Sequence, residues 1–343
     1  MRAVRIREHG DYDVLKFEDV PAPVPRADEV LVRIRAAGLN HLDTWVRRGV
    51  PGYKFPLPIT PGCDGAGLVE RVGDGVTHVK PGDPVVLSPG TSCGLCRECL
   101  AGDDNLCRYY GILGETRDGT CAEFVAVPAR NVLPKPPALS FEEAASIPLV
   151  FLTAWHMLVA RARVRPGEWV LVRAAGSGVG TAAIQMAKML GATVVAEARS
   201  KEKTEKARAL GADFTIDSSG SDVLDDVRKL TGKRGVDVVI ENVGEPTWES
   251  SVRSLAKGGR LVTCGATAGP DVRLDLRILF FKNISLLGST MGSKAEVIEI
   301  LAHVAAGRLR PVIDTILPFE RVADGHRMLA ERKVFGKIVL TLP

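Results

Sequence analysis

Residues 169–198 read WVLVRAAGSGVGTAAIQMAKMLGATVVAEA. This stretch begins with a short, mostly apolar run, Trp169–Arg173, which has the length of a buried strand and leads into a glycine-rich turn. From Thr181 to Leu190 the apolar side chains recur at helical spacing, and Gly191 is a typical helix stop. A second apolar strand follows at Thr193–Ala196. A strand, a helix and a strand so close together predict a parallel βαβ unit.

The same alternation extends over residues 153–288. A second helix is expected at 201–210 and is again followed by a glycine, Gly211. Further strands are expected at residues 214–216, 236–240, 260–263 and 285–287. Strands that alternate with helices predict an α/β domain with a doubly wound parallel sheet.

Residues 1–152 show a different pattern. Glycine and proline are frequent, short valine-rich runs occur at 30–35, 67–72 and 83–87, and turn residues recur about every 8–12 positions. This pattern predicts a β-rich domain. The last stretch, 289–343, is expected to contain a helix at 294–306 and a final strand at 336–340.

The composition limits the kinds of partner. The 343 residues are 45% apolar and 25% charged, with a formal net charge of +4, which does not suggest a nucleic-acid partner. No run of 18 apolar residues predicts a membrane span, and the start lacks the pattern of a signal peptide. We therefore expect a cytoplasmic protein that acts on a small molecule. A single glutamine, Gln185, and few asparagines favour a thermophilic source.

The turn between the first strand and its helix is a candidate dinucleotide site. It contains Gly176, Ser177, Gly178, Val179 and Gly180. Such a turn directs backbone N–H groups and a helix N-terminus at a pyrophosphate, and missing side chains let the backbone come close. The glycine spacing is an imperfect fingerprint, but its place inside a βαβ unit favours binding of NAD or NADP.

The end of the second strand bears on the choice of cofactor. An acidic residue at the position of Ala198 would bond the ribose 2′-hydroxyl of NAD, whereas Glu197 is one residue early and should point to the opposite face. Arg199 and Lys203 follow, and they are suited to the 2′-phosphate of NADP unless they are ordinary surface charges. NADP is favoured, with NAD as the alternative.

Four cysteines lie close together in the β-rich part. Their spacing is C-x2-C-x2-C-x7-C, and they are Cys93, Cys96, Cys99 and Cys107. Closely spaced cysteines on tight turns suit a tetrahedral four-sulfur site, which usually holds zinc, and the expected cytoplasmic location disfavours disulfides. Because four thiolates leave no open position, we predict one structural zinc per chain.

Four features carry a family resemblance: the four-cysteine lobe, the glycine-rich turn at 176–180, the string Gly62-Cys-Asp-Gly-Ala-Gly67 and the closing Gly336-Lys337. Through them, nearly the whole chain resembles the medium-chain dehydrogenase/reductase superfamily. The resemblance implies a GroES-like catalytic domain at 1–152 and 289–343, with the zinc lobe at 90–110, and a Rossmann domain at 153–288. It also implies hydride transfer in a cleft between the domains, a homodimer or homotetramer, and further cofactor contacts from Thr153, Val243 and Lys337.

The sequence departs from zinc alcohol dehydrogenases at the catalytic metal. In those enzymes a cysteine, a histidine and a second cysteine hold the zinc. Asn40 stands at the first position, Cys63-Asp64 replaces the histidine string, and Pro148–Phe151 contains no cysteine. The hydroxyl that relays the alcohol proton is replaced by Leu42. A catalytic zinc is therefore not expected.

Asn40 and Asp43, with Tyr53 shortly after, resemble the quinone oxidoreductase branch instead. These enzymes pass hydride from NADPH to an electron-poor acceptor such as a quinone or an enone without a catalytic metal. Asn40 and Tyr53 are candidate hydrogen-bond donors to the acceptor oxygen. Asp43 either positions the substrate or anchors its loop.

Two alternatives stay open. One is a zinc-dependent alcohol dehydrogenase with irregular ligands, with Cys63, Asp64 and His41 as candidates. The other is a protein that binds NADPH without catalysing a reaction.

Overall fold

The computed structural model describes residues 1–342, which fold into two compact units. Of these residues, the first unit contains 1–149 and 293–342, and the second contains Val150–Gly292. The boundary between Leu149 and Val150 falls inside helix α4 (Pro148–Trp155), which continues as a π-helical turn at His156–Arg161. Within residues 1–342 no helix combines the length and apolar character needed to cross a membrane.

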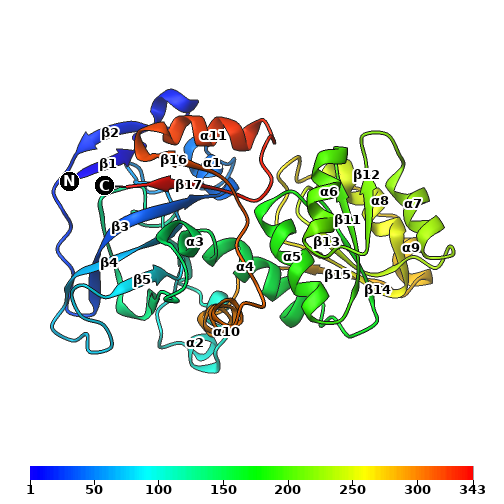
Figure 1. The fold of residues 1–343 in the computed structure, drawn as a ribbon, viewed down its shortest axis with the longest axis horizontal. Coiled ribbons are helices and arrows are strands. Elements are labelled where there is room, and N and C mark those ends of the chain that lie inside the picture. Colours follow the sequence, from blue (N-terminus) through cyan, green and yellow to red (C-terminus); the bar gives the residue numbers. More distant parts are fainter. Residues whose placement is uncertain (343) are drawn as a thin grey trace. The chain divides into compact units, whose positions relative to one another are not determined.

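The second unit is built on a six-stranded sheet whose strands are all parallel (Figure 1). Its order is β12-β11-β10-β13-β14-β15, so that β10, the first strand of this unit along the chain, lies in the middle of the sheet. The strands are β10 (Trp169–Val172), β11 (Thr193–Ala198), β12 (Phe214–Asp217), β13 (Val236–Glu241), β14 (Leu255–Thr263) and β15 (Ser285–Gly288). This order, with a reversal between β10 and β13, is that of a Rossmann sheet and confirms the predicted α/β class.

Helices cover both faces of this sheet. They are α5 (Gly178–Met189), α6 (Lys201–Ala209), α7 (Val223–Leu230), α8 (Glu245–Ser254) and the shorter α9 (Leu276–Phe281). Figure 1 shows α5 and α6 on one side of the strands and α7 and α8 on the other. Val227 of α7 and Val252 of α8 pack with Leu171, Val195 and Val239 in one buried apolar cluster. Burial of this continuous apolar surface is the main stabilising contribution in the unit.

The first unit is built on a seven-stranded mixed sheet. Its path is β16-β17-β3-β4-β5-β9, and β8 pairs with β3 beside that path. The strands are β3 (Glu29–Leu39), β4 (Asp64–Val72), β5 (Pro84–Leu87), β8 (Phe124–Pro128), β9 (Val132–Pro134), β16 (Ile313–Pro318) and β17 (Lys337–Thr341). Two strand pairs lie outside it, β1 (Arg2–Arg5) with β2 (Lys16–Asp19) and β6 (Gly90–Thr91) with β7 (Gly111–Ile112). The C-terminal strand β17 thus lies next to β3 from the N-terminal part.

Besides the helix of the cysteine lobe, the first unit contains the helices α1 (His41–Arg48), α3 (Phe141–Ala145), α10 (Lys294–Ala305) and α11 (Val322–Ala330). Helix α1 follows β3 directly and contacts α11, whereas α3 packs on β3 and β4. The core between sheet and helices contains Val32, Ile34, Leu39, Val46 and Ile338. This packing holds the carboxyl end of β3, where α1 begins, in a buried environment.

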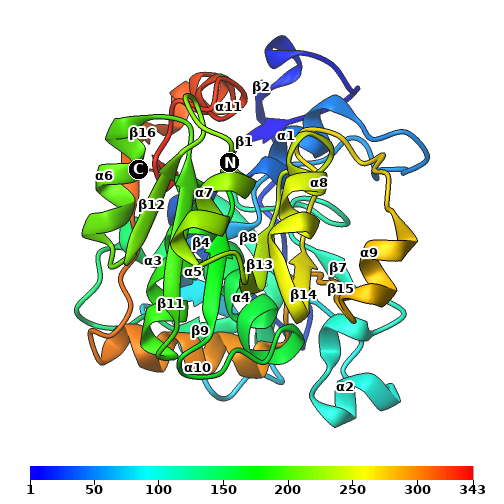
Figure 2. The same cartoon turned by 90° about the vertical axis from the view of Figure 1, so that its right-hand side faces the viewer.

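The cysteine lobe projects from the first unit (Figure 2). It contains helix α2 (Arg97–Ala101) and a 3-10 turn at Asp104–Leu106. Asp104 ties the lobe to α10, because its carboxylate accepts the backbone N–H of Lys294 at 2.9 Å and pairs with the Lys294 ammonium. Ser92 donates to the same carboxylate at 3.1 Å. The lobe is therefore anchored at one edge and otherwise has little apolar core of its own.

Candidate active site and metal centre

The glycine-rich turn lies at the carboxyl end of β10 and opens α5. The helix begins at Gly178, three residues before the expected start, because the Ser177 hydroxyl caps it by accepting the Gly180 N–H at 3.0 Å. Asn242, which follows β13, donates to the same Ser177 oxygen at 3.1 Å. Because the Ser177 oxygen accepts both of these hydrogen bonds, the hydroxyl can still donate its own proton to a phosphate oxygen.

Gly180, in the first turn of α5, lies against the backbone of the turn that follows β10. A Cβ there would lie 2.5 Å from the Ala174 carbonyl oxygen and 2.8 Å from the Ala175 Cα. Both are backbone atoms, so a side chain would push α5 away from β10. The absence of a side chain keeps the helix N-terminus next to the strand end, where it can face an anion.

At the end of β11 the structure separates the charged residues as expected. The Glu197 side chain is buried, accepts the Ala174 N–H at 3.0 Å and pairs with Arg173 at 3.4 Å, so it supports the turn from below. Arg199 is exposed, and within residues 1–342 its guanidinium makes no hydrogen bond or ion pair. Lys203 lies in the first turn of α6. Arg199 is therefore available to a ligand at the strand end.

The other expected cofactor contacts have different surroundings. Val243 lies in the turn after β13, where its N–H donates to the buried Glu241 carboxylate at 2.7 Å. Thr153 is buried in α4. Lys337 belongs to the first unit, where its ammonium contacts Asn40 and Asp64.

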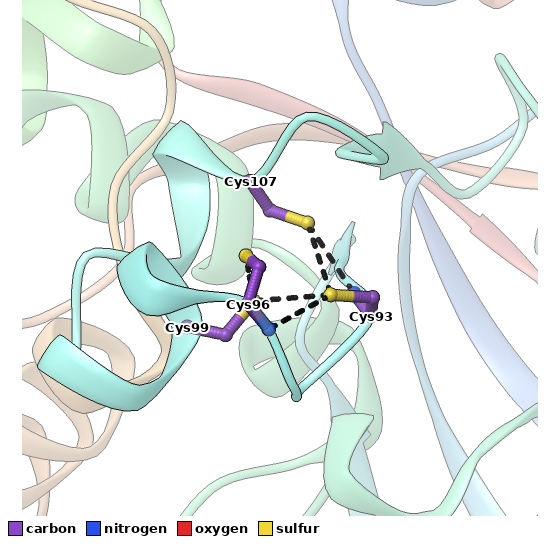
Figure 3. Close-up of side chains that lie close together, drawn as sticks. All are labelled: Cys93, Cys96, Cys99 and Cys107. Atoms are coloured by element: carbon purple, nitrogen blue, oxygen red, sulfur yellow. Dashed lines mark hydrogen bonds between the residues drawn. The ribbon is translucent and has the colours of Figure 1, made fainter.

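The four lobe cysteines converge on one point (Figure 3). Their sulfur atoms lie 3.8 Å apart for Cys93 and Cys99, 3.5 Å for Cys96 and Cys99, and 3.6 Å for Cys93 and Cys107. A tetrahedron with Zn–S bonds of about 2.3 Å has S–S edges of about 3.8 Å. The four thiolates thus fit a structural zinc, and within residues 1–342 no other group of three or more His, Cys, Asp or Glu side chains is placed to share a metal ion.

Backbone N–H groups surround two of the four sulfur atoms, those of Cys93 and Cys107. The N–H groups of Leu95 and Cys96 donate to the Cys93 sulfur at 3.5 and 3.4 Å, and they lower the pKa of Cys93 to about 6. The Cys107 sulfur accepts the N–H groups of Cys93 at 3.4 Å and Tyr109 at 3.3 Å. These contacts spread the negative charge that a four-thiolate site must carry.

A second polar cluster forms where three neighbouring strands of the first unit meet. Asn40 follows the end of β3, Asp64 begins β4, and Lys337 begins β17. The register pairs Gly38 with Asp64 and Ile338 with Leu39, so these ends lie at one edge of the sheet. The three side chains are almost fully buried. Asn40 thus contacts Asp64 and Lys337 directly, although they lie 24 and 297 positions away from it in the sequence.

Lys337 uses all its hydrogens in this cluster. Its ammonium donates to Asn40 Oδ1 at 2.6 Å, to the Leu39 carbonyl at 2.9 Å and to Asp64 Oδ2 at 3.0 Å. An ammonium has three N–H groups, so none is left for a cofactor phosphate in this structure.

The Asn40 amide is also engaged. Its Nδ2 lies within hydrogen-bond distance of Asp64 Oδ2 at 2.9 Å, Cys63 Sγ at 3.2 Å and the Gly38 carbonyl at 3.2 Å. Two hydrogens face three acceptors of the protein itself. Asn40 was expected to donate to the acceptor oxygen, but here its amide serves the cluster instead.

Asp43 anchors the loop. Its Oδ2 accepts the Asn40 N–H at 2.7 Å and its Oδ1 accepts the Gly62 N–H at 3.0 Å. The side chain is 1% exposed, and burial raises its pKa to about 7. Of the two roles considered for Asp43, this geometry favours the anchor.

The chain is similar to known dehydrogenases and oxidoreductases over its whole length. The model of the "Zinc-binding dehydrogenase" family matches residues 178–306, and the model of the "Alcohol dehydrogenase GroES-like domain" matches residues 26–137. An NAD-dependent alcohol dehydrogenase of Sulfurisphaera tokodaii is 34% identical, with 99% of each chain covered. The quinone oxidoreductase of Homo sapiens is 31% identical over 100% of this chain and 98% of its own.

The chain belongs to the medium-chain dehydrogenase/reductase superfamily.

Solved structures agree with this assignment. The crystal structure of an NAD-dependent alcohol dehydrogenase has a TM-score of 0.97 and 52% identity, and it covers 100% of both chains. As a member of the superfamily, the protein is an NAD(P)-dependent oxidoreductase with a GroES-like domain, a Rossmann domain and a structural four-cysteine zinc site. The alternative of a non-catalytic NADPH-binding protein is therefore wrong.

The donors expected of a catalytic zinc site in this superfamily do not fit here. The Cys63 thiol is fully buried, burial raises its pKa well above the usual value, and its sulfur lies 3.2 Å from Asn40 Nδ2. Burial also lowers the pKa of His41 to about 4, but His41 does not join Cys63 and Asp64 in a metal-binding group. Asp64 is already neutralised by the Lys337 ammonium. A divalent ion in contact with these groups would face an adjacent positive charge.

Sequence reasoning missed two members of the cluster's ion pair. The sequence predicts Lys337 as a cofactor contact and Asp64 only as an alternative metal ligand. A usable signal is present, since each is a charged residue at the first position of a strand and is followed by at least three glycine or apolar residues. Tyr53 is not part of this cluster. It lies in the loop after α1 and is 45% exposed, and the centroid of its ring is 4.6 Å from that of Phe55.

Proposed function

We propose that this protein is an NAD(P)H-dependent reductase of activated carbonyl compounds, such as enones or quinones, and that its only zinc is the one in the cysteine lobe. The observation that supports this most is the Lys337 ammonium, which lies between Asn40 and Asp64, where a divalent ion would have to share these ligands. An electron-poor acceptor needs orientation and hydrogen bonds more than it needs a Lewis acid.

In this proposal the chain's own residues bind and orient. The turn at Gly176–Gly180 and the start of α5 hold the pyrophosphate, and the bound dinucleotide supplies the hydride. Tyr53, whose hydroxyl hydrogen-bonds to the Glu115 carboxylate in this structure, is the remaining candidate donor to the acceptor oxygen. Asn40 becomes a positioning residue, because its amide contacts Lys337, Asp64 and Cys63 rather than solvent.

A second candidate is a zinc-dependent alcohol dehydrogenase. The names of the relatives favour it, since more of the compared proteins are named alcohol dehydrogenases than quinone oxidoreductases. In this chain it would require Cys63 to lose its proton and Lys337 to leave Asp64. Both candidates are oxidoreductases with a structural zinc, so they differ in the second metal and in the substrate.

Metal analysis combined with turnover separates the two candidates. We expect one zinc per chain, reduction of an enone or quinone panel that survives mild chelation, and kcat/KM for ethanol or benzyl alcohol at least about 100-fold lower, because no metal polarises the alcohol oxygen. Two zinc ions per chain, with alcohol oxidation abolished by a chelator and restored by zinc, would establish the second candidate instead.

For the cofactor we propose NADP(H) rather than NAD(H). Arg199 is exposed at the end of β11, Ala198 replaces an acidic residue, and Glu197 is held below the turn. A relative named as NAD-dependent points the other way, which makes the choice worth measuring. Arg199→Ala should raise the Kd for NADPH by about tenfold, or about 1.4 kcal/mol, and leave the Kd for NADH nearly unchanged. Calorimetric titration with both cofactors measures this, and an equal loss for both would show that Arg199 does not read the 2′-phosphate.

A further inference from the structure

The Lys337 ammonium is bound in the manner of a free cation. Three oxygens surround it at 2.6, 2.9 and 3.0 Å: Asn40 Oδ1, the Leu39 carbonyl and Asp64 Oδ2. The side chain is 3% exposed, and that of its partner Asp64 is fully buried. These distances are those of N–H···O bonds and are longer than the bonds of about 2.0–2.2 Å that zinc or magnesium forms with oxygen. The shell therefore has the distances of a fully hydrogen-bonded ammonium group.

The charge arrangement depends on this cation. Asp64 Oδ1 accepts the Leu149 N–H at 2.8 Å, while Oδ2 accepts both Lys337 and Asn40. Asp43 and Asp64 both act on the buried Cys63 thiol, and Lys337 is the opposing positive charge. Without the ammonium, a buried carboxylate would lose its only counter-ion in this cluster.

The cation also determines how the Asn40 amide is oriented. Asn40 Oδ1 points to Lys337, and its Nδ2 points to Asp64 and Cys63. If the positive charge is removed, Oδ1 loses its partner, and only the contacts of Nδ2 still hold the amide in this orientation. The position of Asn40 and of the start of α1 thus depends on a side chain that arrives from β17.

We propose that Lys337 is a tethered cation: its ammonium occupies a three-oxygen cation site at the edge of β17, β3 and β4, and a free alkylammonium ion can take this site when the side chain is shortened. The cation is a positioning group for Asn40 and Cys63. Its effect on turnover rests on the proposed reductase function, whereas the cation site itself does not.

Lys337→Ala with added propylammonium tests the proposal. The ion has the length of the missing side-chain atoms, and n-propanol is its uncharged counterpart. We expect kcat for acceptor reduction to fall about 100-fold, as for a displaced reacting group, and propylammonium to restore it at least tenfold with saturation. The melting temperature of the variant should rise with propylammonium, and n-propanol and tetramethylammonium should have no such effect.

Lys188→Ala is the matched control, because Lys188 also pairs with an aspartate, Asp213, at 2.8 Å, but its side chain is 35% exposed. Propylammonium should change neither its melting temperature nor its kcat. Equal rescue of Lys337→Ala by n-propanol, or no stabilisation by propylammonium, would overturn the cation site. Stabilisation by propylammonium in a protein whose wild type reduces no acceptor would retain the cation site and refute the reductase function.

Discussion

Cys96→Ser is expected to release the zinc and to lower the melting temperature by roughly 10 °C, since loss of a structural metal is among the few changes that cost about 4–5 kcal/mol. Apart from the contacts of Asp104 with Lys294 and Ser92, the lobe has little to keep it folded. Helix α2 has five residues, and Leu95, Leu100 and Leu106 are 82%, 75% and 65% exposed. A helix this short is not stable alone in water. The metal therefore takes the place of a hydrophobic core in the lobe.

Metal analysis and thermal unfolding of the purified variant check this prediction. Cys264→Ser is the matched control, because Cys264 lies in the second unit outside the four-cysteine group, and it should keep one zinc per chain. If Cys96→Ser retained a full equivalent of zinc, the four-cysteine assignment would be wrong. Loss of zinc without a change in melting temperature would show that the anchor between Asp104 and Lys294 holds the lobe by itself.

Gly180→Ala should have the largest effect in the second unit. The added Cβ would meet the Ala174 carbonyl oxygen at 2.5 Å and the Ala175 Cα at 2.8 Å. Backbone atoms do not rotate out of the way, so α5 must move away from β10, at a cost of about 3 kcal/mol in unfolding free energy. The N-terminus of α5 moves with it, and the Kd for NADPH should rise at least about tenfold.

Chemical denaturation and cofactor titration measure the two effects. Gly220→Ala is a suitable control, since no atom lies within 4 Å of its Cβ position and its φ is not in the left-handed region. This control should stay within about 0.5 kcal/mol of the wild type. Wild-type affinity for NADPH in Gly180→Ala would mean that the turn does not hold the dinucleotide.

Two parts of this protein were predictable because their physics is local. The βαβ unit at 169–198 follows from periodicity, glycine positions and the short distance between its elements. The zinc lobe follows from four cysteines within fifteen residues, whose spacing alone confines the sulfurs. Even here the capping hydroxyl of Ser177 moved the start of α5, which periodicity does not reveal.

The cluster of Asn40, Asp64 and Lys337 depended on the tertiary structure. Lys337 reaches Asn40 only because β17 lies next to β3, and a strand pairing across about 300 residues leaves no spacing pattern in the sequence. The sequence by itself determined the Rossmann unit, the zinc ligands and the absence of the usual catalytic ligands at Asn40 and Cys63. Only the tertiary structure decided that Lys337 neutralises Asp64 and uses up the Asn40 amide, because burial and partner choice arise when distant strands pack.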